Sequence, residues 1–174
     1  MYADGTSISG FWVTDTVCVL DDPNACVKDF AWCAADIADG LREREDGIMG
    51  MMYEYSEHSN ALYVPELYAA GTISENVFSF YLTDGGTFDG ETDTSYMDFG
   101  TPNTSVMSSE EDLIWIENIE YYGWWTEYVS GYRWKDMPDS ESYYEVGVTP
   151  KPAITDTGTS CIYGPYSAVN PLVS

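Results

Sequence analysis

The most informative segment of the chain reads Ala153-Ile154-Thr155-Asp156-Thr157-Gly158-Thr159-Ser160. Asp156 follows a short apolar run that predicts a strand, and small hydroxyl residues and a glycine come directly after it. In a tight turn of this kind, backbone N–H groups and hydroxyls can fix the orientation of a carboxylate, and Gly158 lets the backbone approach closely. An ordinary Asp-Gly-type turn between two strands is the structural alternative. The pattern favours a functional carboxylate.

Shorter motifs surround this segment in a fixed order along the chain. Downstream stand Gly164-Pro165 and Ser167-Ala168. Residues 2–10 read Y-A-D-G-T-S-I-S-G and predict a hairpin around a turn-forming Asp-Gly pair. The remaining motifs are Asp15-Thr16-Val17, Asp46-Gly47-Ile48-Met49-Gly50, V-F-S-F-Y-L at 77–82, Trp115-Ile116 and Tyr121-Tyr122-Gly123-Trp124-Trp125. Each motif is modest alone, whereas their joint order is a strong signal.

Taken together, these motifs resemble the pepsin-like aspartic proteases across nearly the whole chain. The D-T-G-T-S segment with its following G-P and S-A is similar to the second catalytic loop of that family, and residues 2–10 are similar to its flap hairpin. The resemblance implies an all-β, bilobal pepsin-like acid protease fold. Residues 1–100 would be the C-terminal part of the first lobe, and residues 101–174 the N-terminal part of the second lobe. Both lobes would then be incomplete.

The resemblance also assigns roles to the residues of the catalytic loop. Asp156 would be one of two aspartates that share a proton and bind the attacking water between them, as aspartic proteases do. The loop around it would be supported by Thr157, Gly158 and Thr159. Thr159 would in addition form a hydrogen bond with the substrate backbone.

The flap and one specificity pocket follow from the same resemblance. The residues expected to close over an extended peptide substrate are Tyr2, Asp4 and Gly5. Ile48 would line an apolar pocket near the scissile bond, which suits cleavage between hydrophobic residues. The chain departs from the family pattern at Ala3, where the flap usually has glycine, and at Met49, where leucine is common. The first change is expected to stiffen the hairpin tip, and the second is a tolerated apolar replacement.

A single D-T-G occurs in the 174 residues, although the mechanism needs two aspartates. The first D-T/S-G of the family precedes the flap, and the flap-like segment here begins at residue 2. We therefore expect the chain to be an internal fragment of a longer protein. The isolated chain is then expected to show little or no proteolysis.

Three functions can be distinguished on these grounds. The first is an aspartic endopeptidase, monomeric when complete and acting on peptides or proteins at acid pH. The second is a catalytically inactive pepsin-like homologue that binds peptides or serves as a scaffold. The third is a one-aspartate homodimeric protease of the retroviral type. The order of the motifs disfavours it, because its flap follows the D-T-G.

The charge balance excludes several other classes. The chain has 30 Asp and Glu against 6 Lys and Arg, which gives a net charge of −24 at pH 7. Nucleic-acid binding needs clustered basic residues, and so does attraction to anionic membrane surfaces. No segment approaches the ~18 consecutive apolar residues of a membrane helix, so no membrane insertion is expected. With 16% aromatic residues the chain is predicted to be globular, and its acidity suits an acidic working environment.

Other catalytic and metal chemistries find little support. His58 is the only histidine and stands in a polar run without a nucleophile motif, which favours an exposed loop residue. No P-loop motif is present. The cysteine spacings do not match zinc pairs, and we expect neither a metal nor a cofactor.

The cysteines and one sequon indicate the compartment. A disulfide between two of the first three cysteines is expected, and Cys18 with Cys26 could close the loop containing residues 21–24. Asn103-Thr104-Ser105 fits the N-glycosylation acceptor pattern. The family resemblance implies a secreted or acidic lysosomal or vacuolar protein, although no cleavable signal peptide opens the chain.

Local patterns predict mostly strands. The expected strands are 8–19, 30–37, 77–82, 114–119 and 143–148. A helix is expected at 62–70, where Val64-Pro65-Glu66 opens a first turn and Gly71 provides a stop. A second short helix is expected within 160–168. Residues 83–109 are poor in large aliphatics and predict a solvated loop.

Overall fold

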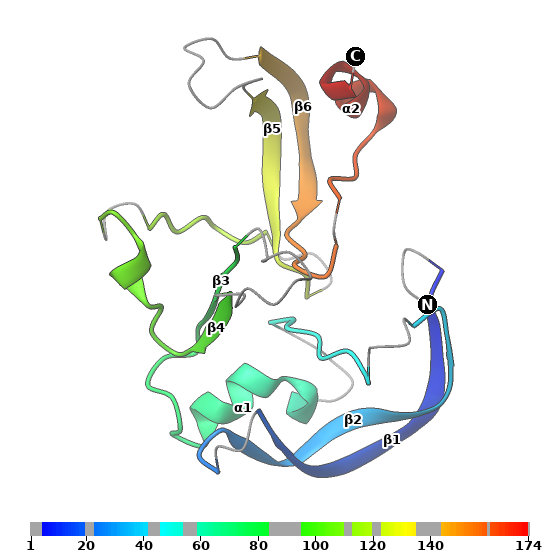
Figure 1. Ribbon diagram of the computed structural model, residues 1–174, viewed down its shortest axis with the longest axis vertical. Helices are drawn as coiled ribbons and strands as arrows, with labels where there is room; N and C mark the ends of the chain where they lie inside the picture. The colour runs from blue at the N-terminus through cyan, green and yellow to red at the C-terminus, as the bar shows by residue number, and fades with distance from the viewer. Residues whose placement is uncertain are drawn as a thin grey trace, which may run out of the picture. The chain divides into compact units, whose positions relative to one another are not determined.

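The computed structural model describes residues 5–19, 23–41, 46–53, 59–83, 95–109, 113–119, 123–134, 144–159 and 161–173. The chain forms two compact units, unit 1 at Met1–Leu113 and unit 2 at Ile114–Ser174. Most of the regular structure is strand, so the all-β prediction is confirmed (Figure 1). The lobe division expected between residues 100 and 101 stays a prediction, because it concerns the complete bilobal fold.

A long antiparallel ribbon dominates unit 1. Strand β1 (Ser7–Cys18) pairs with β2 (Cys26–Asp39), close to the predicted strands (Figure 1). The register shifts between Ser9 and Gly10, which marks a β-bulge. A Cβ atom at Gly10 would lie 2.1 Å from the carbonyl oxygen of Ala34, so only glycine fits there. The last glycine of the flap-like motif therefore has a steric reason within this ribbon.

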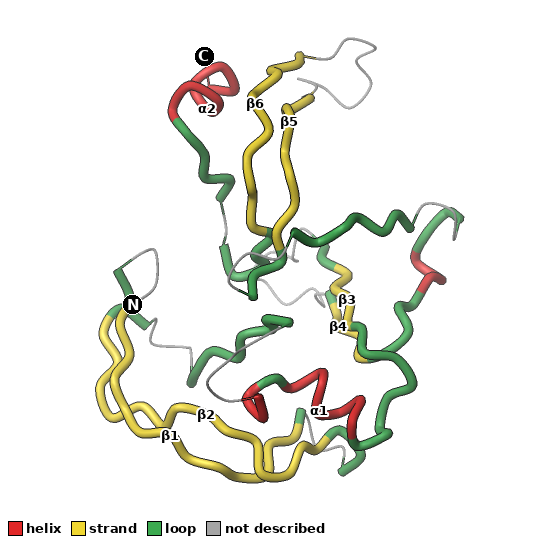
Figure 2. The backbone as a smooth tube through the Cα atoms, turned by 180° about the vertical axis from the view of Figure 1, so that it is seen from behind, coloured by secondary structure: helices red, strands yellow, loops and turns green. Residues whose placement is uncertain are grey.

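The core of unit 1 lies between β2 and a short helix. Helix α1 (Tyr63–Ala69) confirms the predicted helix and lies against β2 (Figure 2). Tyr63 and Leu67 of α1 are each only 1% exposed and pack with Val27 and Phe30 of β2. The rings of Tyr63 and Phe30 meet edge to face, with centroids 5.8 Å apart. This cluster is the buried core of the described residues.

Tyr63 also ties the core to the β1–β2 connection. Its hydroxyl accepts a hydrogen bond from the Val19 N–H at 3.1 Å and donates one to the carbonyl oxygen of Ala25. The disulfide between Cys18 and Cys26 closes the same connection. The pairing of these two cysteines is thus confirmed, and it leaves Cys33 and Cys161 as exposed free thiols.

A second strand pair corrects one sequence prediction. Strand β3 (Phe78–Tyr81) lies within the predicted 77–82 and pairs antiparallel with β4 (Tyr96–Phe99). Strand β4 falls inside the segment 83–109, which was expected to be loop throughout. That expectation is wrong for β4, because pairing with β3 and stacking of Tyr96 on Tyr81 compensate for the few aliphatic residues. The short 3₁₀ helices are η1 (Ser59–Ala61) and η2 (Thr104–Val106).

Unit 2 is built on one hairpin. Strand β5 (Thr126–Trp134) pairs antiparallel with β6 (Tyr144–Ile154), and helix α2 (Tyr166–Val173) contacts β6. The strand expected at 143–148 is confirmed but extends to Ile154, and its partner β5 was not predicted. The expected strand at 114–119 is wrong. Its apolar residues Ile114, Trp115 and Ile116 are more than 70% exposed, and these residues form no strand pair in the structure as described.

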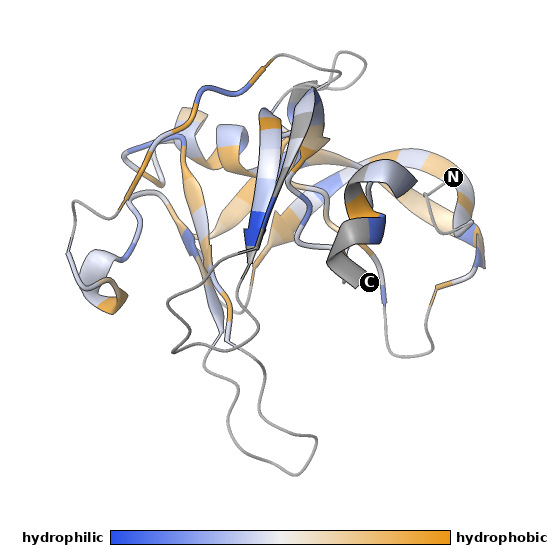
Figure 3. Ribbon diagram, turned by 90° about the horizontal axis from the view of Figure 1, so that it is seen from above, coloured by the Kyte–Doolittle hydropathy of each residue, from blue (hydrophilic) through white to orange (hydrophobic). Residues whose placement is uncertain are grey.

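The second helix begins later than the sequence suggests. Residues 162–165 have no regular structure, and α2 starts directly after Pro165. Pro165 has no backbone N–H to donate, and its carbonyl oxygen accepts from the Val169 N–H, so Pro165 stands at the N-terminal boundary of α2. In the ribbon colouring by hydropathy, orange hydrophobic segments alternate with pale ones along the strands (Figure 3). No helix among the described residues is long and apolar enough to cross a membrane.

Candidate active site

The β5–β6 hairpin places Asp156 in unit 2. Strand β6 ends at Ile154, which pairs with Thr126 at the start of β5. One residue further on, the Thr155 N–H donates to the carbonyl oxygen of Trp125 at 2.9 Å. The chain is therefore held to β5 up to the residue before Asp156, and the D-T-G turn starts from a fixed point.

Thr126, which lies at the base of this turn, is held by several hydrogen bonds. Thr126 is only 2% exposed, its N–H donates to the Asn118 side-chain oxygen at 2.7 Å, and its carbonyl oxygen accepts from the Ile119 N–H at 2.8 Å. Its hydroxyl donates to the carbonyl oxygen of Trp124 at 3.1 Å. A buried polar residue with its hydrogen bonds satisfied is stabilising rather than costly. Thr126 thus holds Asn118 and Ile119 at the start of β5.

The carboxylate of Asp156 is oriented by its own loop. The Gly158 N–H donates to Oδ1 at 2.9 Å, and the Thr159 hydroxyl donates to Oδ2 at 2.5 Å. The Thr159 N–H donates to the Asp156 carbonyl oxygen at 3.2 Å and closes the turn. Hydrogen bonds to an ionised carboxylate are among the stronger ones in proteins. Each carboxylate oxygen therefore has one fixed donor.

Gly158 has a local reason to be glycine. A Cβ atom at this position would lie 3.1 Å from Asp156 Oδ1, which is tighter than an ordinary contact. A side chain here would push against the carboxylate and weaken the bond from the Gly158 N–H. The exposed Thr157 lies between Asp156 and the first of the two donor residues, Gly158.

Asp156 remains accessible in this arrangement. The residue is exposed, and a carboxylate has about four acceptor positions, of which the loop occupies two. The free positions can accept hydrogen bonds from water or from a second acid. The geometry is that of an oriented carboxylate ready to share a proton or hold a water molecule.

The sequence did not predict one hydrogen-bonded pair beside the turn, Thr155 with Glu127. The hydroxyl of Thr155 donates to both carboxylate oxygens of Glu127, each at 3.1 Å. Glu127 lies on β5, almost thirty residues earlier in the chain, and is cross-strand partner to Ala153. Only the register of β5 and β6 brings the two residues together. Residues 126–129 read T-E-Y-V, without the alternation of apolar and polar residues that marks a strand, so no local sequence signal pointed to this contact.

The other predicted site residues belong to unit 1. Tyr2 and Asp4 lie outside the described residues, whereas Gly5 is exposed with φ +93°, a conformation that suits glycine. Ile48 is 54% exposed in a segment without regular structure. Asn103 is exposed at the start of η2. The structure thus gathers residues 155–159 into one site, and the flap and pocket roles stay predictions.

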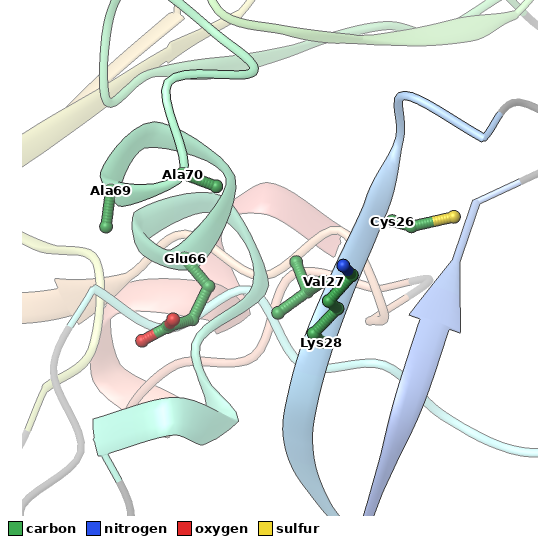
Figure 4. A pocket seen from close by; sticks show the side chains of 6 residues that line it. All are labelled: Cys26, Val27, Lys28, Glu66, Ala69 and Ala70. Carbon is green, nitrogen blue, oxygen red and sulfur yellow. The ribbon is translucent and has the colours of Figure 1, made fainter.

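One pocket of unit 1 contains none of the predicted catalytic, flap or substrate-pocket residues. It measures about 440 Å³ and is lined by Cys26, Val27, Lys28, Glu66, Ala69 and Ala70 (Figure 4). These residues come from β2, from α1 and from its C-cap residue Ala70, with Val27 pointing toward the helix. Cys26 is committed to the disulfide. In the described part of the chain, no three His, Cys, Asp or Glu side chains are grouped to hold a metal ion.

The family is shown by comparison with known proteins. The model of the eukaryotic aspartyl protease family matches residues 1–174, and the chain therefore belongs to this family. The D-T-G loop described above is consistent with that assignment.

One relative matches nearly the whole chain and is itself much longer. The chain is 27% identical over 179 residues to the "Probable aspartic-type endopeptidase opsB" of Aspergillus oryzae. The match covers 97% of this chain and 34% of the relative. The chain thus spans about a third of the length of that protein.

Proposed function

We propose that the complete protein is an aspartic endopeptidase, in which Asp156 is one of two aspartates that activate a water molecule. The observation that carries this proposal is the Asp156 carboxylate, held by Gly158 N–H and the Thr159 hydroxyl in a member of the aspartyl protease family. The second aspartate is expected in the remainder of the complete protein.

In this mechanism the two carboxylates share one proton, because two like charges about 3 Å apart do not both ionise readily. One carboxylate takes a proton from the water as it attacks the scissile carbonyl carbon, and the other donates a hydrogen bond to the carbonyl oxygen. The apparent titration belongs to the pair. The two loop donors keep the Asp156 oxygens in place while the proton moves, so no reorientation is needed during the reaction.

Substrate binding would use the other residues predicted from the sequence. The substrate is expected to be an extended peptide, covered by the flap residues Tyr2, Asp4 and Gly5. Ile48 would contribute to an apolar subsite, consistent with its exposed side chain. The Thr159 hydroxyl donates to Asp156 and keeps acceptor capacity for a substrate N–H.

We place the protein in a secreted or acidic lysosomal or vacuolar setting. The disulfide between Cys18 and Cys26 supports an oxidising compartment. The net charge of −24 supports an acidic one, because protonation of carboxylates at low pH reduces their mutual repulsion.

The test is cleavage of a denatured protein substrate at acid pH by the complete protein. The proposal expects cleavage that a statine-type inhibitor blocks, and a monomer by light scattering. No cleavage would favour the inactive homologue that binds peptides, whereas cleavage that the inhibitor does not block would indicate a different protease mechanism; either result would contradict the proposal. The 174-residue chain alone is expected to show little or no cleavage, and robust inhibitor-sensitive activity from it would contradict the two-aspartate assignment.

A further inference from the structure

An exposed sequon in unit 1 has no part in the proposed chemistry. Asn103-Thr104-Ser105 follows strand β4, and both Asn103 and Ser105 are exposed. Of the six asparagines in the sequence, only Asn103 is followed by the N-x-[ST] pattern. Such a pattern occurs often by chance, so its local structure decides what it can do.

The segment after β4 is held at the surface by several hydrogen bonds. The Gly100 N–H donates to the Val77 carbonyl oxygen at 2.7 Å, and the Asn103 N–H donates to Asp98 Oδ2 at 3.2 Å. Asn103 caps η2, since its Oδ1 accepts the Ser105 N–H at 3.1 Å. The backbone at the sequon is therefore held by hydrogen bonds, while Asn103 and Ser105 are exposed.

The hydrogen bonds of Asn103 leave room for a substituent on its amide nitrogen. Nδ2 carries two hydrogens, and one of them is donated to the Tyr96 hydroxyl at 3.2 Å. Glycosylation replaces one hydrogen with a sugar carbon. The glycosylated amide still has one N–H, and its oxygen can still accept from the Ser105 N–H, so the modification is compatible with the η2 cap.

The disulfide of unit 1 indicates a cellular compartment in which such a modification is made. The disulfide between Cys18 and Cys26, in the same unit, needs an oxidising compartment to form and persist. In eukaryotes, N-linked glycans are added in that secretory environment. The exposure of Asn103, the hydrogen bonds around it and the disulfide therefore all favour glycosylation at this position.

We propose that Asn103 carries an N-linked glycan in the mature protein. In the transfer, Asn103 Nδ2 attacks the anomeric carbon of an oligosaccharide joined to a lipid pyrophosphate. The N–C bond forms as the C–O bond to phosphate breaks, the lipid pyrophosphate leaves, and one Nδ2 proton goes to a base. The donor is supplied by the secretory glycosylation machinery and not by this chain.

The test uses the complete protein secreted from a eukaryotic host, digested with an amidase that releases N-glycans in heavy-oxygen water. We expect the peptide containing position 103 to appear as aspartate with one heavy oxygen. Recovery of mostly unmodified Asn103 peptide from untreated protein would overturn the proposal.

Matched variants separate the sequon from the local fold. Ser105→Ala removes the hydroxyl that the sequon requires but keeps the backbone N–H that donates to Asn103 Oδ1. We therefore expect complete loss of the glycan and an unchanged free energy of unfolding in urea. Ser105→Thr retains the sequon and is expected to retain the glycan. Glycan loss in Ser105→Thr, or its persistence in Ser105→Ala, would contradict the assignment. The readout is a peptide mass, so it stands whether or not the protein cleaves peptides.

Discussion

The buried cluster of unit 1 and the D-T-G turn of unit 2 are organised in opposite ways. In unit 1, Tyr63 and Leu67 are almost fully buried and owe their positions to packing against residues distant in sequence. In unit 2, Asp156 is exposed and owes its orientation to residues two and three positions further on. Stability and the orientation of Asp156 therefore depend on different residues of the chain. Changes in the core should alter unfolding, and changes in the turn should alter catalysis.

The largest effect on stability is expected from Leu67→Ala in the core. Removing a fully buried leucine side chain leaves a cavity and costs about 2–5 kcal/mol. Urea unfolding of the complete protein measures this change. Tyr68→Ala is the control on the same helix, because Tyr68 is 49% exposed and its removal should cost about 0.5 kcal/mol or less. Equal losses for the two variants would mean that α1 does not bury the face described above.

Removal of the disulfide is the next largest change. Replacing both Cys18 and Cys26 by alanine frees a loop with a sequence separation of 8, and chain-entropy reasoning gives a loss of about 2–3 kcal/mol. Cys33→Ala with Cys161→Ala is the matched control, since both thiols are free and exposed. If the control pair destabilised the protein as much, the pairing in solution would differ from the one described.

In the turn, we expect Thr159→Ala to lower activity and leave the free energy of unfolding nearly unchanged, in contrast to the loss of stability expected for Leu67→Ala in the core. Loss of the hydroxyl that donates to Asp156 Oδ2 should lower kcat/KM about tenfold, which corresponds to about 1.4 kcal/mol. The free energy of unfolding should change by less than about 1 kcal/mol, because the pair is exposed. Thr159→Ser should restore activity.

The control for this variant is Thr101→Ala in unit 1. The Thr101 hydroxyl donates to Glu75 Oε2 at 2.8 Å, so it is a similar exposed threonine–carboxylate pair outside the turn. We expect its kcat/KM to stay at the wild-type value. A similar loss in both variants would show that the Thr159 effect is not specific to the turn.

The smallest effect is expected at the pair of Thr155 and Glu127. Glu127→Ala removes the acceptor that holds the Thr155 hydroxyl, and we expect a two- to fivefold loss in kcat/KM, about 0.4–1 kcal/mol. Glu127→Gln keeps an acceptor oxygen and should lose less. Glu145→Ala, at the far end of the hairpin in an ion pair with Arg133, controls for the loss of charge. A loss for Glu145→Ala as large as for Glu127→Ala would point to net charge as the cause.

Local sequence patterns predicted the features that depend on neighbouring residues. Strands β1, β2, β3 and β6, helix α1 and the Cys18–Cys26 pairing all follow from short-range patterns and were confirmed. The turn around Asp156 is equally local, because glycine and hydroxyl residues two and three positions on provide its donors.

The missed features depend on pairing between distant segments. Strand β4 is four residues long and gains its hydrogen bonds from β3, so its own composition predicted a loop. In β5, a register shift between Val129 and Gly131 breaks the alternation that marks a strand. The contact of Glu127 with Thr155 was missed for the same reason, since it exists only once β5 and β6 are in register.

The most direct test of the catalytic role of Asp156 is kcat/KM for Asp156→Asn in the complete protein at acid pH. An asparagine oxygen can still accept from the Gly158 N–H, so the free energy of unfolding should change by less than about 1 kcal/mol. The amide cannot take or share the proton, and kcat/KM should fall by about 10²–10⁴-fold. A variant that keeps wild-type, inhibitor-sensitive activity would show that Asp156 is not a catalytic aspartate.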